Sequence, residues 1–322
     1  MLFTVIIATC GRPERLKRNL EAVRRAVDAA GGRHRLIVAD NGPAYSAESV
    51  VNEFAGSVSW PVRYLKTEPL NKTKALNAAI RVADTEWFAF TDDDTVPDPD
   101  WLRQAANFTG QNDCPMFGGR IVPGNTDTPL PWWLRPGKSG RFPYIIGVYV
   151  KYEPLARSGT IEGSMMAPFG ANVFVKRDLF GIVGEYDENL WDLCRRCALG
   201  VEDSEFGHRL KRRGYRIGYC HEAVVVHPVH HDRCTLWQHI RFAYYFGWRE
   251  PIVFPEENKK RFQWYRLRFA CRALAGGIRD VLMRDFAGAA DNGVKAIMGC
   301  GALFGRWSGA YRQRVRFLRG RM

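Results

Sequence analysis

The chain has 322 residues, 46% of them apolar and 25% charged, a composition that excludes disordered and fibrous proteins. The net charge is +13, but residues 259–322 hold 15 basic and three acidic side chains, a net +12, so the first 258 residues are almost neutral. No stretch has the roughly 18 uninterrupted apolar residues of a membrane-spanning helix, the N-terminus lacks a signal-peptide pattern, and the eight cysteines are too scattered for a disulfide framework. We therefore expect a globular protein of the reducing cytoplasm.

Strands and helices alternate over the first 125 residues. Apolar, β-rich runs predict strands at 3–8, 36–39, 62–65 and 87–90. Pro13 opens a helical pattern that ends at Gly31-Gly32, Ser46 can cap a helix that runs to Phe54, and a third helix is predicted at 73–83. This alternation with short connections predicts an α/β fold with a mainly parallel sheet flanked by helices.

The remainder of the chain is less regular. Residues 123–143 are rich in Pro and Gly and predict a loop, whereas 170–176 and 223–226 look like strands and 202–213 like a helix. From Thr235 onward the pattern is helical, aromatic and basic. We expect an α/β domain at 1–234 and a helical C-terminal extension at 235–322.

Polar residues follow three of the predicted strands. They are Thr9 and Arg12 after the first, Asp40 after the second, and Asp92, Asp93 and Asp94 after the fourth. In parallel α/β sheets, ligands bind beyond the carboxyl ends of the strands. These residues are therefore the first candidates for a site.

The run Thr91-Asp92-Asp93-Asp94-Thr95 is the most specific of these features. Three consecutive carboxylates repel one another unless a cation or hydrogen-bond donors neutralise them. Alternate residues of an extended segment point the same way, so Asp92 and Asp94 can converge on Mn²⁺ or Mg²⁺. The alternative is a solvated acidic turn, which the following Pro97 and Pro99 would suit.

Several segments occur in a characteristic order. They are Val5-Ile6-Ile7-Ala8-Thr9, Val38-Ala39-Asp40-Asn41-Gly42, Asn71-Lys72-Thr73-Lys74-Ala75-Leu76-Asn77, Thr91-Asp92-Asp93-Asp94, Gly170-Ala171-Asn172, Gly184-Glu185-Tyr186-Asp187 and Val201-Glu202-Asp203-Ser204-Glu205-Phe206-Gly207. So ordered, they resemble the family 2 glycosyltransferases, which have the GT-A fold. The resemblance covers roughly the first 230 residues and is more specific than any single motif. It implies a nucleotide-sugar-binding half at 1–125 and an acceptor-binding half at 126–234.

The resemblance implies transfer of a sugar from a nucleoside diphosphate sugar to an acceptor, usually with inversion. Matched by position, Thr9 and Asp40 would contact the nucleoside, and Lys72 would lie near the diphosphate. Asp94 would bind the metal directly, and Asp92 would contact the ribose or a metal-bound water.

Two further residues belong to the candidate donor site. Asp93 lies inside the acidic motif, and Arg12 follows the first strand. Arg12 can equally be a surface charge at the start of a helix, and Lys72 can belong to a solvated helix face.

Glu202 and Asp203 open a predicted helix and supply the candidate base for the acceptor hydroxyl. A carboxylate near a helix N-terminus is stabilised in its ionised form. The resemblance favours Asp203 as the base, with Glu202 orienting the acceptor or a loop. The alternative is an ordinary capping acid.

Histidine follows the apolar run at 223–226, and some similar enzymes complete the metal site with a histidine at about this place. His227 is the preferred candidate over His230 and His231, although a structural histidine is an equal alternative. A zinc site at Cys194-Arg195-Arg196-Cys197 lacks a clean second pair of cysteines.

Aromatic residues and one asparagine add weaker candidates. Trp132, Trp133 and Trp191 can stack on a sugar or anchor the core. The segment Gly170-Ala171-Asn172 can line the donor or acceptor pocket, since small residues let a ligand approach the backbone, or it can belong to a close-packed strand.

The basic tail interleaves arginine with aromatic residues, the chemistry of helices that bind anionic membrane surfaces. A helical subdomain with a basic, solvated face is the alternative for the tail.

For the whole chain, we expect a glycan or lipid-linked acceptor, a UDP-sugar donor by default, no nucleic-acid partner, and a role in cell-surface polysaccharide or glycolipid synthesis. The alternatives for the whole chain are a nucleotidyltransferase and an inactive carbohydrate- or membrane-binding scaffold.

Overall fold

The computed structural model describes residues 2–31, 34–124, 131–134, 150–161, 167–194, 201–229, 234–255 and 260–319. The chain divides into two compact units. The sheet unit comprises Met1–Gly124, Lys151–Trp191 and Glu202–Pro228, and the helical unit comprises Asn125–Val150, Asp192–Val201 and Val229–Met322.

The described part of the sheet unit contains nine strands that form one sheet. They are β1 (Phe3–Thr9), β2 (Arg35–Asp40), β3 (Val62–Lys66), β4 (Trp87–Asp92), β5 (Val96–Pro97), β6 (Met116–Gly124), β7 (Gly159–Thr160), β8 (Asn172–Lys176) and β9 (Ile217–Pro228). Their order is β3-β2-β1-β4-β8-β6-β9-β5, with β7 on β9. The first four are parallel, as the sequence predicts, while β8 lies antiparallel between β4 and β6.

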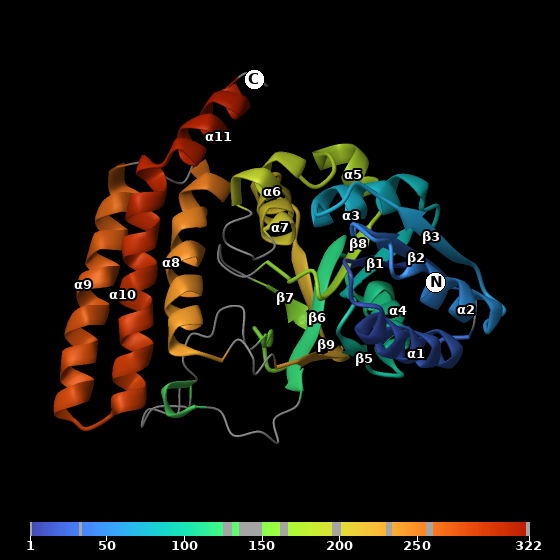
Figure 1. Ribbon diagram of the computed structural model, residues 1–322, viewed down its shortest axis with the longest axis horizontal. Helices are drawn as coiled ribbons and strands as arrows, with labels where there is room; N and C mark the ends of the chain where they lie inside the picture. Colours follow the sequence, from blue (N-terminus) through green and yellow to red (C-terminus); the bar gives the residue numbers. More distant parts are fainter. Residues whose placement is uncertain are drawn as a thin grey trace. The chain divides into compact units, whose positions relative to one another are not determined.

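Helices connect and flank these strands (Figure 1). They are α1 (Pro13–Ala29), α2 (Glu48–Gly56), α3 (Lys72–Val82), α4 (Trp101–Gln111), α5 (Asp178–Val183), α6 (Glu188–Cys194), whose last residues belong to the helical unit, and α7 (Glu202–Arg212). Pro13 starts α1, and its predicted apolar face is buried in the core together with β1 and β2.

The start of α2 differs from the expectation. The helix begins at Glu48, and Ser46 makes no capping bond. Instead the backbone N–H of Ala47 donates to Asp40 Oδ2 at 3.2 Å. A buried carboxylate from β2 therefore satisfies a donor at the entry to the helix, in place of the local side chain.

Parallel register brings the predicted polar residues to one edge of the sheet. Thr9 pairs with Asp40 across β1 and β2, and Ala8 pairs with Asp92 across β1 and β4. Strands β1, β2 and β4 are buried along their length, so the polar groups that can face a ligand lie at their carboxyl ends.

The helical unit contains α8 (Leu236–Val253), α9 (Lys260–Leu282), α10 (Phe286–Trp307), α11 (Gly309–Arg319) and the short 3₁₀ helix η1 (Trp132–Leu134). Figure 1 shows α8, α9 and α10 side by side, with α10 packed against both others. Gly301 and Gly305 let α10 approach α8 closely, because a Cβ at either would collide with the carbonyl oxygens of Tyr244 and Trp248. None of the described helices is long and apolar enough to cross a bilayer.

Candidate active site

The acidic run after β4 is held in a fixed turn. Asn19, buried on α1, donates to the carbonyl oxygens of Asp92 at 3.1 Å and Thr95 at 3.0 Å. The Thr91 and Thr95 hydroxyls lie 2.7 Å apart and hydrogen-bond to each other. These hydrogen bonds fix the backbone that carries the three carboxylates, unlike in a solvated acidic turn.

Asp93 points into the protein. Its Oδ2 accepts a hydrogen bond from the Thr9 hydroxyl at 2.7 Å, and its Oδ1 lies 2.8 Å from Arg12 Nη2. Burial raises the pKa of Asp93 to about 6, although the Arg12 guanidinium and the Thr9 hydroxyl act in the opposite direction. Three sequence-predicted donor-site residues thus meet in one network, in which Thr9 and Asp93 are buried and Arg12 is partly exposed. Their contact with a nucleotide stays a prediction.

Asp92, Asp94 and His227 form a cluster whose ligand atoms all lie within 4.8 Å of one another. His227 Nε2 is 4.0 Å from Asp94 Oδ1, and His227 Nδ1 is 3.0 Å from the Pro228 carbonyl oxygen. That contact suits a proton on Nδ1, which leaves Nε2 as the ligand atom on the side of Asp94. Two carboxylates and an imidazole fit a divalent transition metal such as Mn²⁺.

Arginines compensate the charge of Asp94. Arg12 Nη1 is 3.3 Å and Arg15 Nη1 is 3.6 Å from Asp94 Oδ2. Arg12 therefore contacts two of the three acidic residues, and its position supports a role at the site more than that of an isolated surface charge.

Lys72 joins the acidic motif to α7. Its Nζ lies 2.7 Å from Asp92 Oδ1 and 3.6 Å from Glu202 Oε1. Burial alone would lower the pKa of Lys72, but Asp92 and Glu202 outweigh it and raise the pKa above its usual value. The lysine is thus a fixed cation between two carboxylates, whereas Lys74 pairs with Glu68 at the surface.

Asp203 lies in the same pocket, and both of its oxygens accept backbone hydrogen bonds. Gly170 N–H donates to Oδ2 and Ser204 N–H donates to Oδ1, each at 2.6 Å. Burial, together with the neighbouring Glu202 carboxylate, raises the pKa of Asp203. The helix N-terminus was expected to favour the ionised form, but burial has the larger effect, which makes Asp203 a stronger base than an exposed aspartate.

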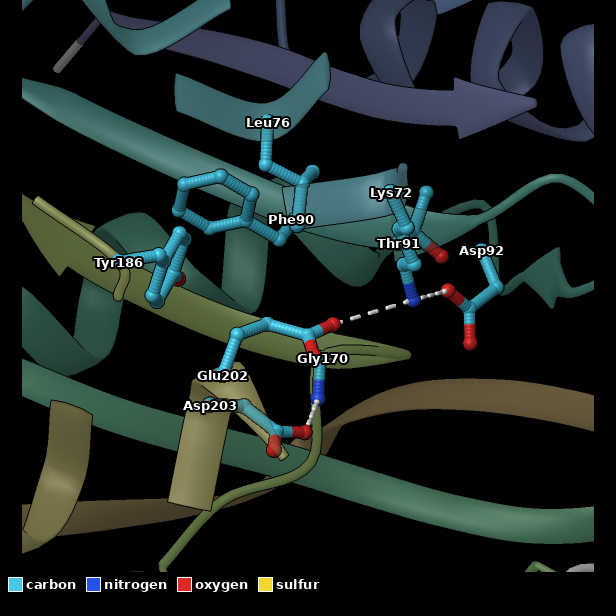
Figure 2. Close-up of a pocket in the computed structure, with 9 residues that line it drawn as sticks. All are labelled: Lys72, Leu76, Phe90, Thr91, Asp92, Gly170, Tyr186, Glu202 and Asp203. Carbon is cyan, nitrogen blue, oxygen red and sulfur yellow. Dashed lines mark hydrogen bonds and ion pairs between the residues drawn. The ribbon is translucent and has the colours of Figure 1, made fainter. Parts of the chain in front are cut away.

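Figure 2 shows this pocket, with Asp92 and Lys72 on one side and Asp203 beside Gly170 on the other. Acidic groups from β4 and α7, more than 100 residues apart in the chain, therefore face one cleft within the sheet unit.

Asp40 is fully buried. Its carboxylate accepts hydrogen bonds from Gly42 N–H at 2.8 Å, the Tyr64 hydroxyl at 2.8 Å and Ala47 N–H. These contacts hold the loop after β2, and nucleoside contact by Asp40 stays a prediction.

In and around the pocket lie residues to which the sequence analysis assigned no individual role. Tyr186 and Phe90 line it, and Asn77 of α3 hydrogen-bonds the backbone of Tyr186 through both its amide nitrogen (2.9 Å) and its oxygen (3.1 Å). Asn19 and Asn77 lie on the buried faces of their helices. A polar residue within an apolar stripe is the signal that could have found both.

The weaker candidates have other contacts. Asn172 is buried, accepting from Trp101 Nε1 and donating to the carbonyl oxygens of Arg120 and Ala223. It therefore links strands, whereas Gly170 of the same segment lines the described pocket. Trp191 donates to the Leu70 carbonyl at 2.8 Å.

In the helical unit, Trp133 packs on His239 with ring centroids 5.3 Å apart, and Trp132 is exposed. None of the seven described cysteines forms a disulfide. Cys197, His230 and His231 lie outside the described residues.

The family model of glycosyl transferase family 2 matches residues 4–178. None of the curated proteins compared with the chain matches it. Among solved structures, residues 1–349 of TarS from S. aureus are 14% identical, with 91% of this chain and 89% of that chain covered and a TM-score of 0.52. The mannosyltransferase PcManGT from Pyrobaculum calidifontis, in complex with GDP-Man and Mn²⁺, is 18% identical, with 97% and 82% covered and a TM-score of 0.52. At these identities the structures show a shared fold, and the predicted GT-A architecture is confirmed.

Proposed function

The chain belongs to glycosyl transferase family 2, and from that premise we propose that it transfers a sugar from a nucleoside diphosphate sugar to an acceptor hydroxyl with inversion. The family and the fold support a glycosyltransferase that uses a nucleotide sugar. The observation behind the finer assignment is the pocket that Asp92, Lys72 and Asp203 line together, with the Lys72 ammonium group between Asp92 and Glu202.

We assign donor binding to the edge formed by β1, β2 and β4, with residues 1–125 as the donor half and 126–234 as the acceptor half. Asp92, Asp94 and His227 would hold Mn²⁺ or Mg²⁺, which would neutralise the negative charge of a diphosphate. Lys72 supplies a fixed positive charge at the same place, and its paired carboxylates keep it protonated. The Mn²⁺ in the mannosyltransferase complex supports this metal assignment.

We assign Asp203 as the general base. Its raised pKa and its fixed orientation suit removal of the proton from an acceptor hydroxyl, and that proton would pass to an Asp203 carboxylate oxygen. Glu202 raises the pKa of Asp203 and positions Lys72, so we assign it a positioning role. Attack from the face opposite the diphosphate inverts the anomeric carbon.

For the substrates, UDP-sugar is the default donor that the family suggests, and a GDP-sugar is the second candidate because PcManGT was solved with GDP-Man. We propose a glycan or lipid-linked acceptor in cell-surface polysaccharide or glycolipid synthesis, reached at a membrane surface.

A thermal-shift panel tests the donor assignment. The protein is melted with UDP-, GDP-, dTDP- and CDP-sugars, each with and without Mn²⁺. A donor present at 100 times its Kd stabilises the folded state by about 2.7 kcal/mol, so a rise of several degrees in Tm is expected for one nucleotide, larger with Mn²⁺.

Two variants test whether the effect of Mn²⁺ on Tm arises at Asp94. Asp94→Asn should remove the gain from Mn²⁺, whereas Asp113→Asn, at a side chain that is 98% exposed, should keep it. No shift with any donor, or a metal effect that survives Asp94→Asn, contradicts the assignment.

A further inference from the structure

Helix α9 presents an apolar stripe to solvent. Six side chains that are 42–78% exposed make up this α9 stripe: Trp264, Leu267, Leu274, Ile278, Val281 and Leu282. Successive members are three, four or seven residues apart, except for the neighbours Val281 and Leu282, so they share one face of the helix. Large apolar surface that stays exposed on one face indicates an interaction site.

The opposite face of α9 is the one that packs in the helical unit. Ala270, Ala273 and Asp280 are buried, and Ala270 is in close contact with Gly299 of α10. Asp280 accepts a hydrogen bond from Asn292 of α10 at 2.7 Å. The α9 stripe therefore points away from α10, which lies beside it in Figure 1.

A row of arginines lies alongside the stripe. Arg268, Arg272 and Arg279 are exposed and separated by four and seven residues. Within the described part of the chain, neither Arg268 nor Arg272 forms an ion pair, and Arg279 pairs only with Asp280. Asp280 is the one acidic residue of α9 and it is buried, so the helix exposes no acidic side chain.

Two occupants could cover such a face. The spacing of the stripe also suits pairing with a second α9. Pairing two copies would bring two arginine rows together without an acidic partner, which costs free energy. An anionic lipid surface meets both requirements, since phosphates neutralise the arginines and the acyl region takes up the apolar side chains.

We propose that α9 is an interfacial helix that lies on anionic phospholipid bilayers, with the α9 stripe inserted at the headgroup boundary and Arg268 and Arg272 on lipid phosphates. The stripe spans 19 residues, from Trp264 to Leu282, about 27 Å of helix along the membrane plane. Met283 and Phe286, at the turn into α10, extend the exposed apolar surface at one end. This inference goes beyond the proposed sugar transfer and does not depend on it.

Vesicle flotation of the whole chain, without any nucleotide sugar, tests the proposal. The protein should float with phosphatidylcholine vesicles that contain phosphatidylglycerol and stay behind with phosphatidylcholine alone. Ile278→Glu should lower partitioning onto the anionic vesicles by at least about tenfold, and so should Arg268→Glu/Arg272→Glu.

Matched controls carry the same changes elsewhere. Ile182→Glu replaces an exposed isoleucine on α5, and Arg25→Glu/Arg63→Glu reverses two exposed arginines of the sheet unit. Both should float like the parent protein. All these side chains are exposed, so the variants should fold, and circular dichroism checks this.

Three flotation results overturn the proposal. They are failure of the parent protein to bind the anionic vesicles, equal binding to both vesicle types, and unchanged binding by Ile278→Glu or by the Arg268→Glu/Arg272→Glu variant. A dimer in sedimentation velocity that Ile278→Glu converts to monomer assigns the stripe to a second copy, and it also overturns the proposal.

Discussion

Replacing Asp203 by asparagine separates its proposed role as a base from its structural contacts. General-base catalysis contributes roughly 10²–10⁴-fold, so Asp203→Asn should lower kcat by about that factor. The substitution keeps the shape of the side chain. Donor binding should change little, because the proposed nucleotide site lies around β1, β2 and β4.

The cost in stability can be worked out from the contacts. Asp203 accepts two backbone hydrogen bonds of 2.6 Å, and an amide keeps only one acceptor oxygen. One backbone N–H, from Gly170 or Ser204, then loses its partner, which costs about 1–3 kcal/mol. The raised pKa of Asp203 shows that the buried charge is itself unfavourable, so its removal offsets part of this cost. Asp203→Asn should therefore remain folded.

The assay is release of nucleoside diphosphate in the presence of an acceptor, measured against pH. Activity of the parent enzyme should fall on the acid side with an apparent pKa above that of an ordinary aspartate, because the base must be ionised. Glu202→Gln removes a negative neighbour that raises the pKa of Asp203, so the acid limb should move to lower pH with a smaller loss of kcat. An Asp203→Asn enzyme within tenfold of the parent, or a larger loss in Glu202→Gln, would refute the assignment of the base.

Two further predictions concern histidines. His227→Ala should weaken Mn²⁺ binding by at least about tenfold in calorimetry, since it removes the proposed nitrogen ligand. His221→Ala, on the same strand, should leave Mn²⁺ binding unchanged. Equal effects of the two substitutions would contradict the proposed ligand set. His239 is buried in the helical unit, and burial lowers its pKa to about 4 from the usual 6.5. The unfolded chain therefore takes up this proton first as the pH falls, so the free energy of unfolding should drop by about 3 kcal/mol between pH 7 and pH 4. Urea titrations of the parent and of His239→Gln measure this, and an unchanged pH slope in the variant would show that His239 is not the cause.

The first four strands could be predicted because each is a local pattern. An apolar run of strand length followed by a polar residue identified β1, β2 and β4, and parallel register then brought Thr9, Asp40 and Asp92 to one edge. Periodicity also identified α1 and α7. The position of the acidic motif is thus a consequence of pattern and topology together.

The second half of the sheet depends on long-range pairing that no local pattern encodes. Strand β8 inserts antiparallel between β4 and β6, although both are distant in sequence. Only residues 223–226 of β9 have a strand pattern, whereas the strand runs from Ile217 to Pro228 with an irregular register opposite Gly119 and Arg120. The buried contacts of Asn172 follow from this pairing, because its amide reaches carbonyl oxygens on both β6 and β9.

The charges of the site provide an independent argument for a divalent cation. Among the described residues, the carboxylates of Asp92, Asp93, Asp94, Glu202 and Asp203 gather there. Arg12, Arg15 and Lys72 lie within ion-pair distance of four of them, Asp92, Asp93, Asp94 and Glu202. A diphosphate would add further negative charge. The raised pKa values of Asp93 and Asp203 reflect burial and the neighbouring carboxylates. One divalent ion at Asp92, Asp94 and His227 would offset part of this negative charge, so donor binding without metal should be weak even though Lys72 is in place.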